Sequence, residues 1–266
     1  MSSRVARLLL MFMMTVALAH GTAFAQATKQ FEPTVGQPGK DVVWVPTPQA
    51  LVEKMLDMAK LTPQDYHMDL GSGDGRTVIT AAKRGARSQG IEYNPDMVAL
   101  SQRNAKEAGV GDRALFTKAD IFETDFSKAN VITLFLLPQL NLRLRPSILN
   151  MKPGTRIVSN SFTMDDWSPD QTETVGGDCV SWCTAHLWIV PAKVQGAWDV
   201  PGRGTLTLNQ SFQMISGTLG SAQVSNGKLR GDEITFTAGG TNYTGKVDGG
   251  TMQLSAGGAK LTATKK

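Results

Sequence analysis

The sequence predicts an α/β protein: a doubly wound parallel sheet with helices, followed by a small antiparallel β meander or partial barrel. Strand-like and helix-like runs alternate regularly from residue 66 to residue 161, which is typical of a parallel sheet covered by helices. A turn with three glycines, Gly71 to Gly75, joins the strand at 66–70 to a helix. Near residues 192–196 the composition changes to short alternating runs rich in Gly, Thr and Ser, which indicates a separate antiparallel unit.

Residues 1–25 have the features of a cleavable signal peptide. Arg4 and Arg7 form a basic leader, residues 8–18 are an apolar run too short to span a bilayer comfortably, and the small residues Ala23 and Ala25 precede Gln26. We therefore expect a periplasmic or secreted protein with no integral membrane segment after cleavage. A retained N-terminal anchor is the alternative, and the short apolar run disfavours it.

Residues 26–41 are polar, contain prolines and glycines, and are expected to form an N-terminal arm. A helix is predicted to follow, with Thr47 as its N-cap and Pro48 in its first turn. Its buried stripe consists of hydrophobic residues at helical spacing, namely Leu51, Met55, Met58 and Leu61.

The alternating region is predicted to form the main sheet. Strands are expected near residues 66–70, 88–92, 113–118, 130–136 and 155–161, helices near 76–85, 95–108 and 138–150, and a final hairpin within 171–190. Ligands of such sheets bind outside the carboxyl ends of the strands. A site is therefore expected where these strands end.

The glycine turn and nearby acidic residues indicate which ligand binds there. The glycines let a ligand lie against the main chain at a helix N-terminus, but Asp69 and Asp74 would repel the pyrophosphate of a dinucleotide. S-adenosylmethionine (SAM) has no phosphate, and it carries an ammonium and a sulfonium that acids attract. Glu92 ends the second strand and is placed to accept hydrogen bonds from both ribose hydroxyls. Asp120 follows the third strand and is placed to accept one from the adenine amino group.

With these residues the sequence resembles the class I (seven-strand) SAM-dependent methyltransferases over roughly Val42 to Pro191. It looks like the branch of small protein-lysine methyltransferases in three stretches: Val45 to Pro48, Asp69 to Arg76, and Arg156 to Phe162. The resemblance implies a Rossmann-like methyltransferase domain, placed at residues 42–193, with SAM as cofactor and a protein lysine as acceptor. In this family the segment before the first helix folds over the cofactor, which adds Thr47 to the expected contacts. The predicted cofactor-binding residues are Thr47, Asp69, Gly71, Ser72, Gly73, Glu92 and Asp120.

Methyl transfer from a sulfonium depends on positioning and desolvation, and it needs no obligatory acid. A lysine nucleophile must first be deprotonated. After the fourth strand, residues 136–141 lack the Asn/Asp-Pro-Pro-aromatic motif of the adenine and glutamine methyltransferases, which argues against those substrates. Gln139, Asn141 and Asn160 are expected to line the substrate side and are the candidate catalytic residues. The alternative for Asn141 is a cap of the helix that follows.

Cys179 and Cys183 are predicted to form a small-loop disulfide in an oxidising compartment, with two buried free thiols as the alternative. A metal site would require more ligands than lie near them, so no metal is expected. His67 and His186 lie in predicted strands and are interpreted as core histidines.

Residues 194–266 are predicted to form a β-rich domain of about six or seven strands. Alternating runs occur near residues 205–208, 212–215, 233–236, 243–247 and 260–263, with hairpin signals at Asn226-Gly227, Gly239-Gly240 and Gly249-Gly250. The domain contains no cluster of acids, histidines or cysteines in its sequence. We therefore interpret it as a packing or docking module, with a second active site as the alternative.

The charge of the chain does not indicate a nucleic-acid partner. The formal net charge of +4 falls to +2 without Arg4 and Arg7. Residues 26–192 carry 17 basic and 19 acidic side chains, whereas residues 193–266 carry 8 and 4. We expect a protein substrate and no nucleic acid, and the sequence leaves the oligomeric state open.

Export and a SAM site conflict, because SAM is made and used in the cytoplasm. The first hypothesis is a SAM-dependent, protein-lysine methyltransferase, and its basis is the three strand-end acids. The alternative is an exported, non-catalytic binding protein that reuses the methyltransferase fold and docks through its β domain.

Overall fold

The computed structural model describes residues 30–177 and 179–266 of the chain. The predicted signal peptide and the first residues of the predicted arm lie outside these residues. Residues 32–266 form one compact unit. No helix in the described part of the chain combines the length and the hydrophobicity that a membrane crossing requires.

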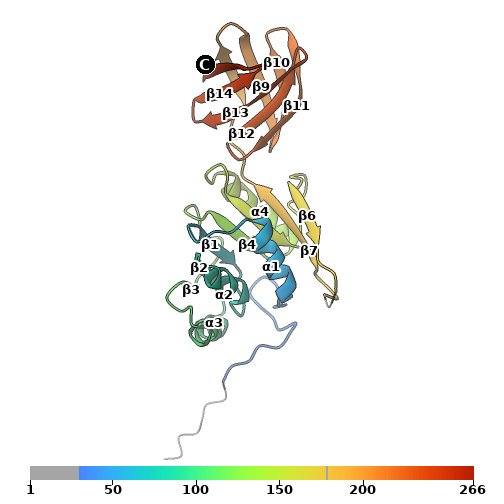
Figure 1. The fold of residues 1–266 in the computed structure, drawn as a ribbon. Coiled ribbons are helices and arrows are strands. Elements are labelled where there is room, and N and C mark those ends of the chain that lie inside the picture. The colour runs from blue at the N-terminus through green and yellow to red at the C-terminus, as the bar shows by residue number, and fades with distance from the viewer. Residues whose placement is uncertain (1–29, 178) are drawn as a thin grey trace, which may run out of the picture. The chain divides into compact units, whose positions relative to one another are not determined.

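A seven-stranded sheet in the order β3-β2-β1-β4-β5-β7-β6 forms the first half of the fold (Figure 1). The first five strands in the chain pair in parallel, and β6 and β7 add an antiparallel edge. This arrangement confirms the predicted doubly wound sheet with its terminal hairpin. The strands are β1 (Tyr66–Leu70), β2 (Arg87–Glu92), β3 (Ala114–Lys118), β4 (Val131–Leu134), β5 (Arg156–Asn160), β6 (Gln171–Thr174) and β7 (Thr184–Ile189).

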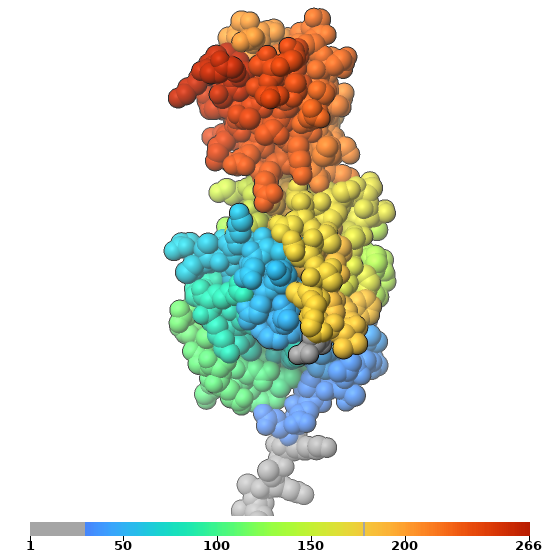
Figure 2. Space-filling view, turned by 45° about the vertical axis from the view of Figure 1, so that its right-hand side comes forward, coloured from blue at the N-terminus to red at the C-terminus, as the bar shows by residue number. Residues whose placement is uncertain are grey.

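Four helices accompany this sheet: α1 (Gln49–Met58), α2 (Arg76–Lys83), α3 (Pro95–Glu107) and α4 (Pro138–Leu149). Helix α1 packs its buried residues Leu51, Met55 and Met58 in one cluster with residues of β4, β5 and β7. It therefore lies beside the hairpin of β6 and β7 at the surface, as Figure 2 shows. Buried residues of α2, α3 and β3 form another cluster.

The expected N-cap of α1 is wrong. Pro48 occupies the N-cap position, and no side chain caps the helix there. The hydroxyl of Thr47 instead accepts a hydrogen bond from the Asn160 side chain at 3.2 Å. This bond ties the start of α1 to the end of β5, next to the carboxyl ends of the strands.

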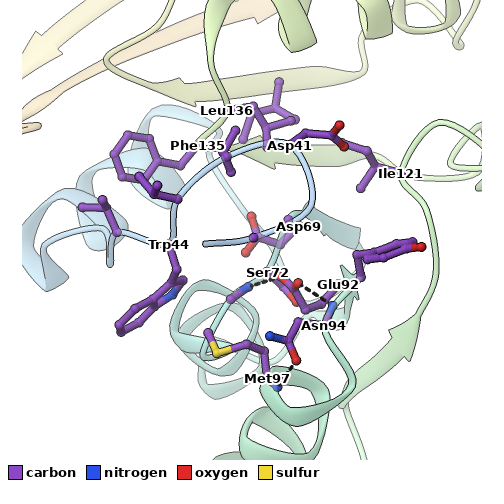
Figure 3. A pocket seen from close by; sticks show the side chains of 18 of the residues that line it. Asp41, Trp44, Asp69, Ser72, Glu92, Asn94, Met97, Ile121, Phe135 and Leu136 are labelled. Carbon is purple, nitrogen blue, oxygen red and sulfur yellow. Dashed lines mark hydrogen bonds between the residues drawn. The ribbon is translucent and has the colours of Figure 1, made fainter. Parts of the chain in front are cut away.

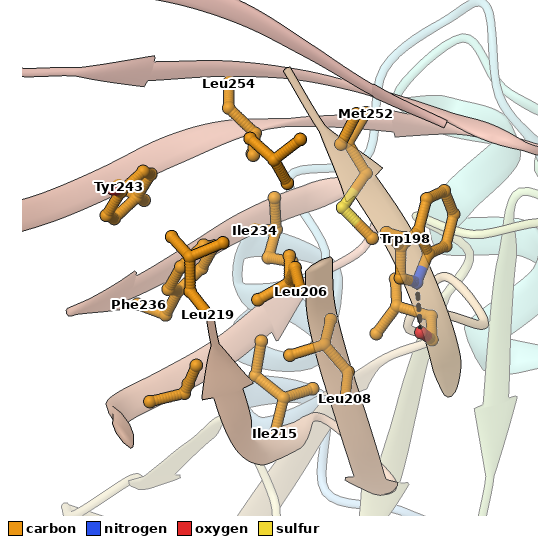
Figure 4. Packing of buried hydrophobic residues seen from close by; sticks show 14 of the residues in the cluster. Trp198, Leu206, Leu208, Ile215, Leu219, Ile234, Phe236, Tyr243, Met252 and Leu254 are labelled. Atoms are coloured by element: carbon orange, nitrogen blue, oxygen red, sulfur yellow. Dashed lines mark hydrogen bonds between the residues drawn. The ribbon is translucent and has the colours of Figure 1, made fainter. Parts of the chain in front are cut away.

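The second half of the fold is a closed barrel of eight antiparallel strands, so the expected meander of six or seven strands underestimates it. Closure comes from β15, which pairs with β8 as well as with β14. The interior is filled by large apolar side chains such as Trp198, Phe236 and Leu254 (Figure 4). The strands are β8 (Gly196–Val200), β9 (Gly204–Ser211), β10 (Met214–Leu219), β11 (Ala222–Arg230), β12 (Glu233–Ala238), β13 (Thr241–Asp248), β14 (Thr251–Ala256) and β15 (Ala259–Lys265).

Two local predictions in the barrel are also wrong. Asn226-Gly227 lies inside β11, at a shift of register against β12, and does not form a hairpin turn. Here Asn226 has a φ of 51°, and a Cβ on Gly227 would lie 2.3 Å from the Ile215 carbonyl oxygen, so the glycine permits close strand approach. Phe212, expected in a strand, lies in the turn between β9 and β10 and stacks on Trp167 of the first half at 5.8 Å.

Candidate cofactor and acceptor site

A cavity of about 560 Å³ lies at the carboxyl ends of β1, β2 and β4 (Figure 3). This volume is in the range of small-molecule and cofactor sites. Its walls come from segments far apart in the chain: residues 37–47, the glycine turn, the segments after β2 and β3, the end of β4, Phe162 and Trp182. The cavity therefore stands where a doubly wound sheet binds its ligand.

The glycine turn brings bare main chain to the cavity. Gly71, Gly73 and Gly75 have φ angles of 83°, 54° and 82°, in the left-handed region that favours glycine. A Cβ on Gly73 would lie 2.6 Å from Nε1 of Trp44. A side chain at Gly73 would therefore displace the wall that Trp44 forms opposite the turn.

Glu92 is fixed by two main-chain donors. Its Oε2 accepts a hydrogen bond from the Gly73 N–H at 3.0 Å, and its Oε1 accepts one from the Asn94 N–H at 2.9 Å (Figure 3). Each carboxylate oxygen can accept more than one hydrogen bond. The carboxylate is thus oriented at the end of β2 with acceptor capacity left for two ribose hydroxyls.

Asp69 is buried at the end of β1, with 6% of its surface exposed. Burial raises the pKa of its carboxyl to about 7, and the neighbouring Asp74 and Glu92 act in the same direction, whereas the hydrogen bond from Thr133 opposes the shift. A carboxylate without a cationic partner is costly in such a place. An ammonium ligand at this end of the cavity would stabilise its charged form.

Asp69 is held by a buried chain of hydrogen bonds that runs through side chains of β1, β4 and β2. The Thr133 hydroxyl donates to Asp69 Oδ1 at 2.5 Å, and His67 contacts Thr133 through Nε2 at 2.9 Å and Ser88 through Nδ1 at 2.6 Å. Burial lowers the pKa of His67 to about 3, so the ring is neutral. When Asp69 is ionised, the Thr133 hydroxyl donates to it, and Nε2 of His67 then carries the ring proton and donates to Thr133. His67 is a hydrogen-bonded core histidine, as the sequence indicated.

Asp120, the predicted adenine acceptor, is already partnered. Its Oδ2 forms an ion pair with Lys40, and its Oδ1 accepts the Phe122 N–H at 2.9 Å. The hydrogen bond from Lys40 is the main cause of the lowered pKa of Asp120. The ammonium of Lys40 also lies 4.7 Å from the ring centroid of Tyr93. The part of the N-terminal arm around Lys40 thus covers the side of the cavity at which Asp120 and Tyr93 lie.

Residues 36–44 of the chain, which include Lys40, form a short hairpin. The N–H of Gly36 donates to the Trp44 carbonyl, and the Trp44 N–H donates to the Gln37 carbonyl, both at 2.9 Å. The predicted boundary at residue 42 therefore separates residues that line the cavity together. Sequence reasoning missed Lys40 and Trp44, and the only available signal was an aromatic residue and a cation shortly before Pro46.

The other end of the cavity is aromatic. Phe135 follows β4, Phe162 follows β5, and Trp182 lies in the loop between β6 and β7. Their ring centroids are 6.2 Å apart for Phe135 and Phe162, 5.7 Å for Phe135 and Trp182, and 5.4 Å for Phe162 and Trp182. We call these three side chains the aromatic patch. Nothing in their sequence spacing indicated that they meet.

The predicted catalytic residues do not line the cavity, which is a correction to their expected position. Gln139 is exposed in the first turn of α4. Asn141 is fully buried inside α4, so it does not cap the helix, and its amide contacts the carbonyls of Phe162 and Thr163 at 3.3 Å. Asn160 is buried and holds Thr47. Asn141 therefore supports the backbone that carries Phe162.

The remaining predicted cofactor residues do line the cavity, although not all by their side chains. Thr47 faces it, and its carbonyl accepts a hydrogen bond from Arg76 at 2.9 Å. The Ser72 hydroxyl is directed to β2, where a Cβ on Gly90 would lie 2.5 Å from its oxygen. Only the main chain of Ser72 is left to contact a cofactor.

Cys179 and Cys183 form a disulfide, as expected, with Cα atoms 5.9 Å apart. Within residues 30–177 and 179–266, no three side chains of the metal-binding types gather into a possible metal site. His186 is half-buried in β7 and contacts Thr172 at 3.0 Å through Nδ1. It is hydrogen-bonded, but its interpretation as a core histidine is wrong, because it lies outside the buried core.

Comparison of the sequence with known proteins finds methyltransferases. A family model described as the ANTKMT methyltransferase domain matches residues 69–171. A protein-lysine N-methyltransferase of Saccharolobus islandicus (strain REY15A) is 41% identical over 152 residues, which are 56% of this chain and 94% of that protein. The chain belongs to the protein-lysine N-methyltransferase family. A Mus musculus relative, the adenine nucleotide translocase lysine N-methyltransferase, is 30% identical over 155 residues, 58% of this chain and 61% of that protein.

A solved structure adds the cofactor to this family assignment. It is described as an RNA methyltransferase from Salinibacter ruber in complex with S-adenosyl-L-homocysteine, the demethylated product of SAM. Its sequence is 45% identical, with a TM-score of 0.53 over 56% of this chain and 96% of that chain. This member of the protein-lysine N-methyltransferase family is a SAM-dependent methyltransferase, and the glycine turn, Glu92 and Asp69 fit SAM by their chemistry.

Proposed function

We propose that this enzyme methylates a lysine side chain of a protein outside the cytoplasm. The observation that carries the proposal is the division of one cavity into two chemically different ends. Acids and bare main chain form one end, next to β1 and β2, and the aromatic patch forms the other. A cationic cofactor fits the first end, and a long aliphatic side chain with a basic nitrogen fits the second.

SAM supplies an electrophilic methyl group on a positively charged sulfur. The lysine ammonium would first lose a proton to solvent. The neutral amine would then form a bond to that carbon while the carbon–sulfur bond breaks and its electron pair stays on sulfur, which leaves a methylated ammonium as product. The protein's part is to orient the amine and to exclude water from the reacting atoms. Asp41, which lies on the same side of the cavity as Leu136 in Figure 3, is placed to attract the incoming lysine ammonium.

In this proposal Glu92 accepts hydrogen bonds from the ribose hydroxyls, and Asp69 attracts the cofactor ammonium. Asp120 accepts a hydrogen bond from the adenine amino group, and Lys40 competes with that group for the Asp120 carboxylate. The main chain of Gly71, Ser72 and Gly73 contacts the methionine part of SAM, and Thr47 holds the start of α1 over it. Asn141 acts by holding the backbone that carries Phe162, Asn160 acts by holding the Thr47 hydroxyl, and Gln139 is assigned no contact.

Export is the second part of the proposal. The leader features of residues 1–25 and a disulfide between the chain's two cysteines favour an oxidising compartment. Fractionation of the native host with an antibody to the protein, followed by N-terminal sequencing, tests it. A mature chain that begins at Gln26 in the periplasmic or secreted fraction supports export, and a cytoplasmic chain that retains Met1 contradicts it.

RNA methylation is a second candidate, because the Salinibacter ruber structure is described as an RNA methyltransferase. The charge disfavours it: residues 26–192 carry 19 acidic against 17 basic side chains, whereas RNA-binding surfaces are markedly basic.

One experiment separates the two acceptors. The purified full chain is incubated with SAM carrying a radioactive methyl group and with an envelope extract of the native host, and the product is treated with protease or ribonuclease. Methyllysine in the acid hydrolysate, with label that resists ribonuclease, supports the proposal. Label that ribonuclease releases contradicts it, and a Glu92→Ala variant gives the background without bound cofactor.

A further inference from the structure

The aromatic patch is assembled by three different loops at the mouth of the cavity. Phe135 and Phe162 are partly buried, whereas 41% of Trp182 remains exposed. Since Trp182 also lines the cavity, its ring forms the boundary between the cavity and solvent. The position of this one ring therefore decides how much aromatic surface an entering side chain meets.

Trp182 has an unusual backbone conformation. Its φ angle is 58°, in the left-handed region, which is uncommon for residues other than glycine and carries a conformational cost for a bulky residue. The Cys179–Cys183 disulfide closes a short ring of chain around it, and the Val175 N–H bonds the Cys183 carbonyl at 2.9 Å. Costly conformations persist where the surrounding structure imposes them, and they gather at functional sites.

Phe162 is held from the opposite side. Ser161, in the left-handed region with a φ of 59°, donates its N–H to the Thr184 carbonyl at 2.7 Å. Asn141 adds its amide bond to the Phe162 carbonyl from inside α4. Two independent devices, a disulfide and a buried amide, thus fix the backbones on which the patch depends.

Aromatic faces attract an ammonium and also the methylated ammonium that the reaction produces. During methyl transfer the positive charge moves from sulfur to the lysine nitrogen, so a face near that nitrogen stabilises the developing charge. The aliphatic part of a lysine packs on the same rings. These properties match the acceptor of the proposed reaction better than an uncharged or anionic substrate.

We propose that Phe135, Phe162 and Trp182 bind the side chain of the lysine that is methylated, and that the Cys179–Cys183 disulfide holds Trp182 in the binding position. This inference rests on the proposed function and adds to it the acceptor site and a dependence on oxidation state. Reduction by dithiothreitol transfers two electrons and two protons to the disulfide, gives two thiols and oxidises the reagent to its cyclic disulfide. Trp182 is then released from the closed ring.

The test uses the full chain with two probes. The first is acetyl-Gly-Lys-Gly-amide, whose methylation by SAM gives kcat and KM; the second is the same peptide with trimethyllysine, whose binding is followed by the NMR signal of its methyl groups. Trp182→Ala should raise the peptide KM and the trimethyl-peptide Kd by about three- to thirtyfold, the range for one cation–aromatic contact. The Kd of SAM should stay unchanged, and Trp182→Phe should recover most of the loss.

Reduction provides a second arm. The chain has two cysteines in all, so dithiothreitol acts on this bond alone. We expect reduction to raise the peptide KM of the wild type and to have no further effect in Trp182→Ala. Val180→Ala is the matched control, since Val180 lies in the same ring of chain, is 95% exposed and does not line the cavity.

The outcomes separate this inference from the proposed function. Unchanged peptide KM and trimethyl-peptide Kd in Trp182→Ala overturn the inference and leave lysine methylation standing. Absence of trimethyl-peptide binding to the oxidised wild type also overturns it. Binding that depends on Trp182, without methyl transfer to any lysine, supports the cation site and contradicts the proposed function.

Discussion

The N–H of Gly73 donates to Glu92 Oε2 at 3.0 Å, so the glycine turn and the end of β2 are joined inside the cavity. The same carboxylate is held by Asn94. Its orientation therefore exists before a ligand arrives, and little conformational freedom is lost on binding.

Glu92→Ala should weaken SAM binding by about a hundredfold. The change removes the acceptor for the ribose hydroxyls and leaves the Gly73 N–H without its partner, and hydrogen bonds to a charged group contribute about 1.5–3 kcal/mol. Calorimetric titration with SAM measures the loss. Glu107→Gln, an exposed carboxylate on α3, is the control and should bind SAM as the wild type does. Equal affinities of Glu92→Ala and the wild type would exclude Glu92 from the cofactor site.

SAM affinity should rise with pH up to about pH 7 and level off above it. Burial holds the pKa of Asp69 at about 7, so the carboxyl is increasingly protonated below that pH. A cofactor ammonium favours the charged form and must displace the proton, which limits the slope to a tenfold change in Kd per pH unit. Titrations from pH 5.5 to pH 8 test this slope, and Asp69→Asn should bind more weakly with little dependence on pH.

Titration of Asp69 should lower the stability of the SAM-free protein as pH rises, whereas it raises SAM affinity. A carboxyl whose pKa is raised on folding stabilises the fold at low pH, and this contribution is lost as pH rises through about 7. The free energy of unfolding of Asp69→Asn minus that of the wild type should therefore increase from about pH 4 to pH 7, because the wild type alone loses stability, and then stay constant. Urea unfolding at several pH values measures it; a constant difference over that range would mean that Asp69 does not titrate there.

Lys40→Ala should strengthen SAM binding severalfold, because Asp120 then serves the adenine amino group alone. The side chain of Lys40 is partly exposed at 35%, so the ion pair is open to screening and the effect should shrink in high salt. Lys54→Ala, a lysine of α1 that does not line the cavity, is the comparison. Weaker binding by Lys40→Ala would mean that the arm contacts the cofactor instead of competing with it.

Gly75→Ala should destabilise the methyltransferase half by about 2–4 kcal/mol, the sum of a left-handed backbone and a packing clash. A Cβ at this position would lie 2.7 Å from the Phe116 ring. Gly109→Ala isolates the backbone part, since Gly109 has a similar φ of 71° with nothing within 4 Å of the added Cβ. It should cost about 1–2 kcal/mol. Similar losses in chemical denaturation of the two variants would show that Phe116 moves aside.

The fold of the first half was predictable because its signals are local. Alternation of strand and helix, the glycine turn and acids at three strand ends all lie within short stretches, and β1 matches the predicted residues 66–70. Barrel closure was not predictable, because it depends on pairing between β8 and β15, far apart in the chain. Asn226-Gly227 resembled a hairpin turn by local chemistry, and the strands around it used the glycine for a bulge instead.

In the cavity, too, the residues with local sequence signals were predictable and those brought together by tertiary packing were not. Glu92 and Asp69 could be placed at the cavity from the sequence, because a residue at the carboxyl end of a parallel strand faces the ligand-binding edge of the sheet. The aromatic patch joins three loops, so only tertiary packing reveals it. Asn141 was predicted as a substrate contact from its position after β4, but its amide is used by the carbonyls of Phe162 and Thr163.

The pairing of β15 with β8 determines when the barrel can finish folding. During synthesis β8 leaves the ribosome first, and it must wait for β15 before the ring of strands can close. Until then β8 and the last strand already made each expose one unpaired edge that can join to other chains. The barrel therefore completes its folding only after translation of β15, and a premature stop between residues 250 and 258 would yield a methyltransferase half attached to an aggregation-prone open sheet.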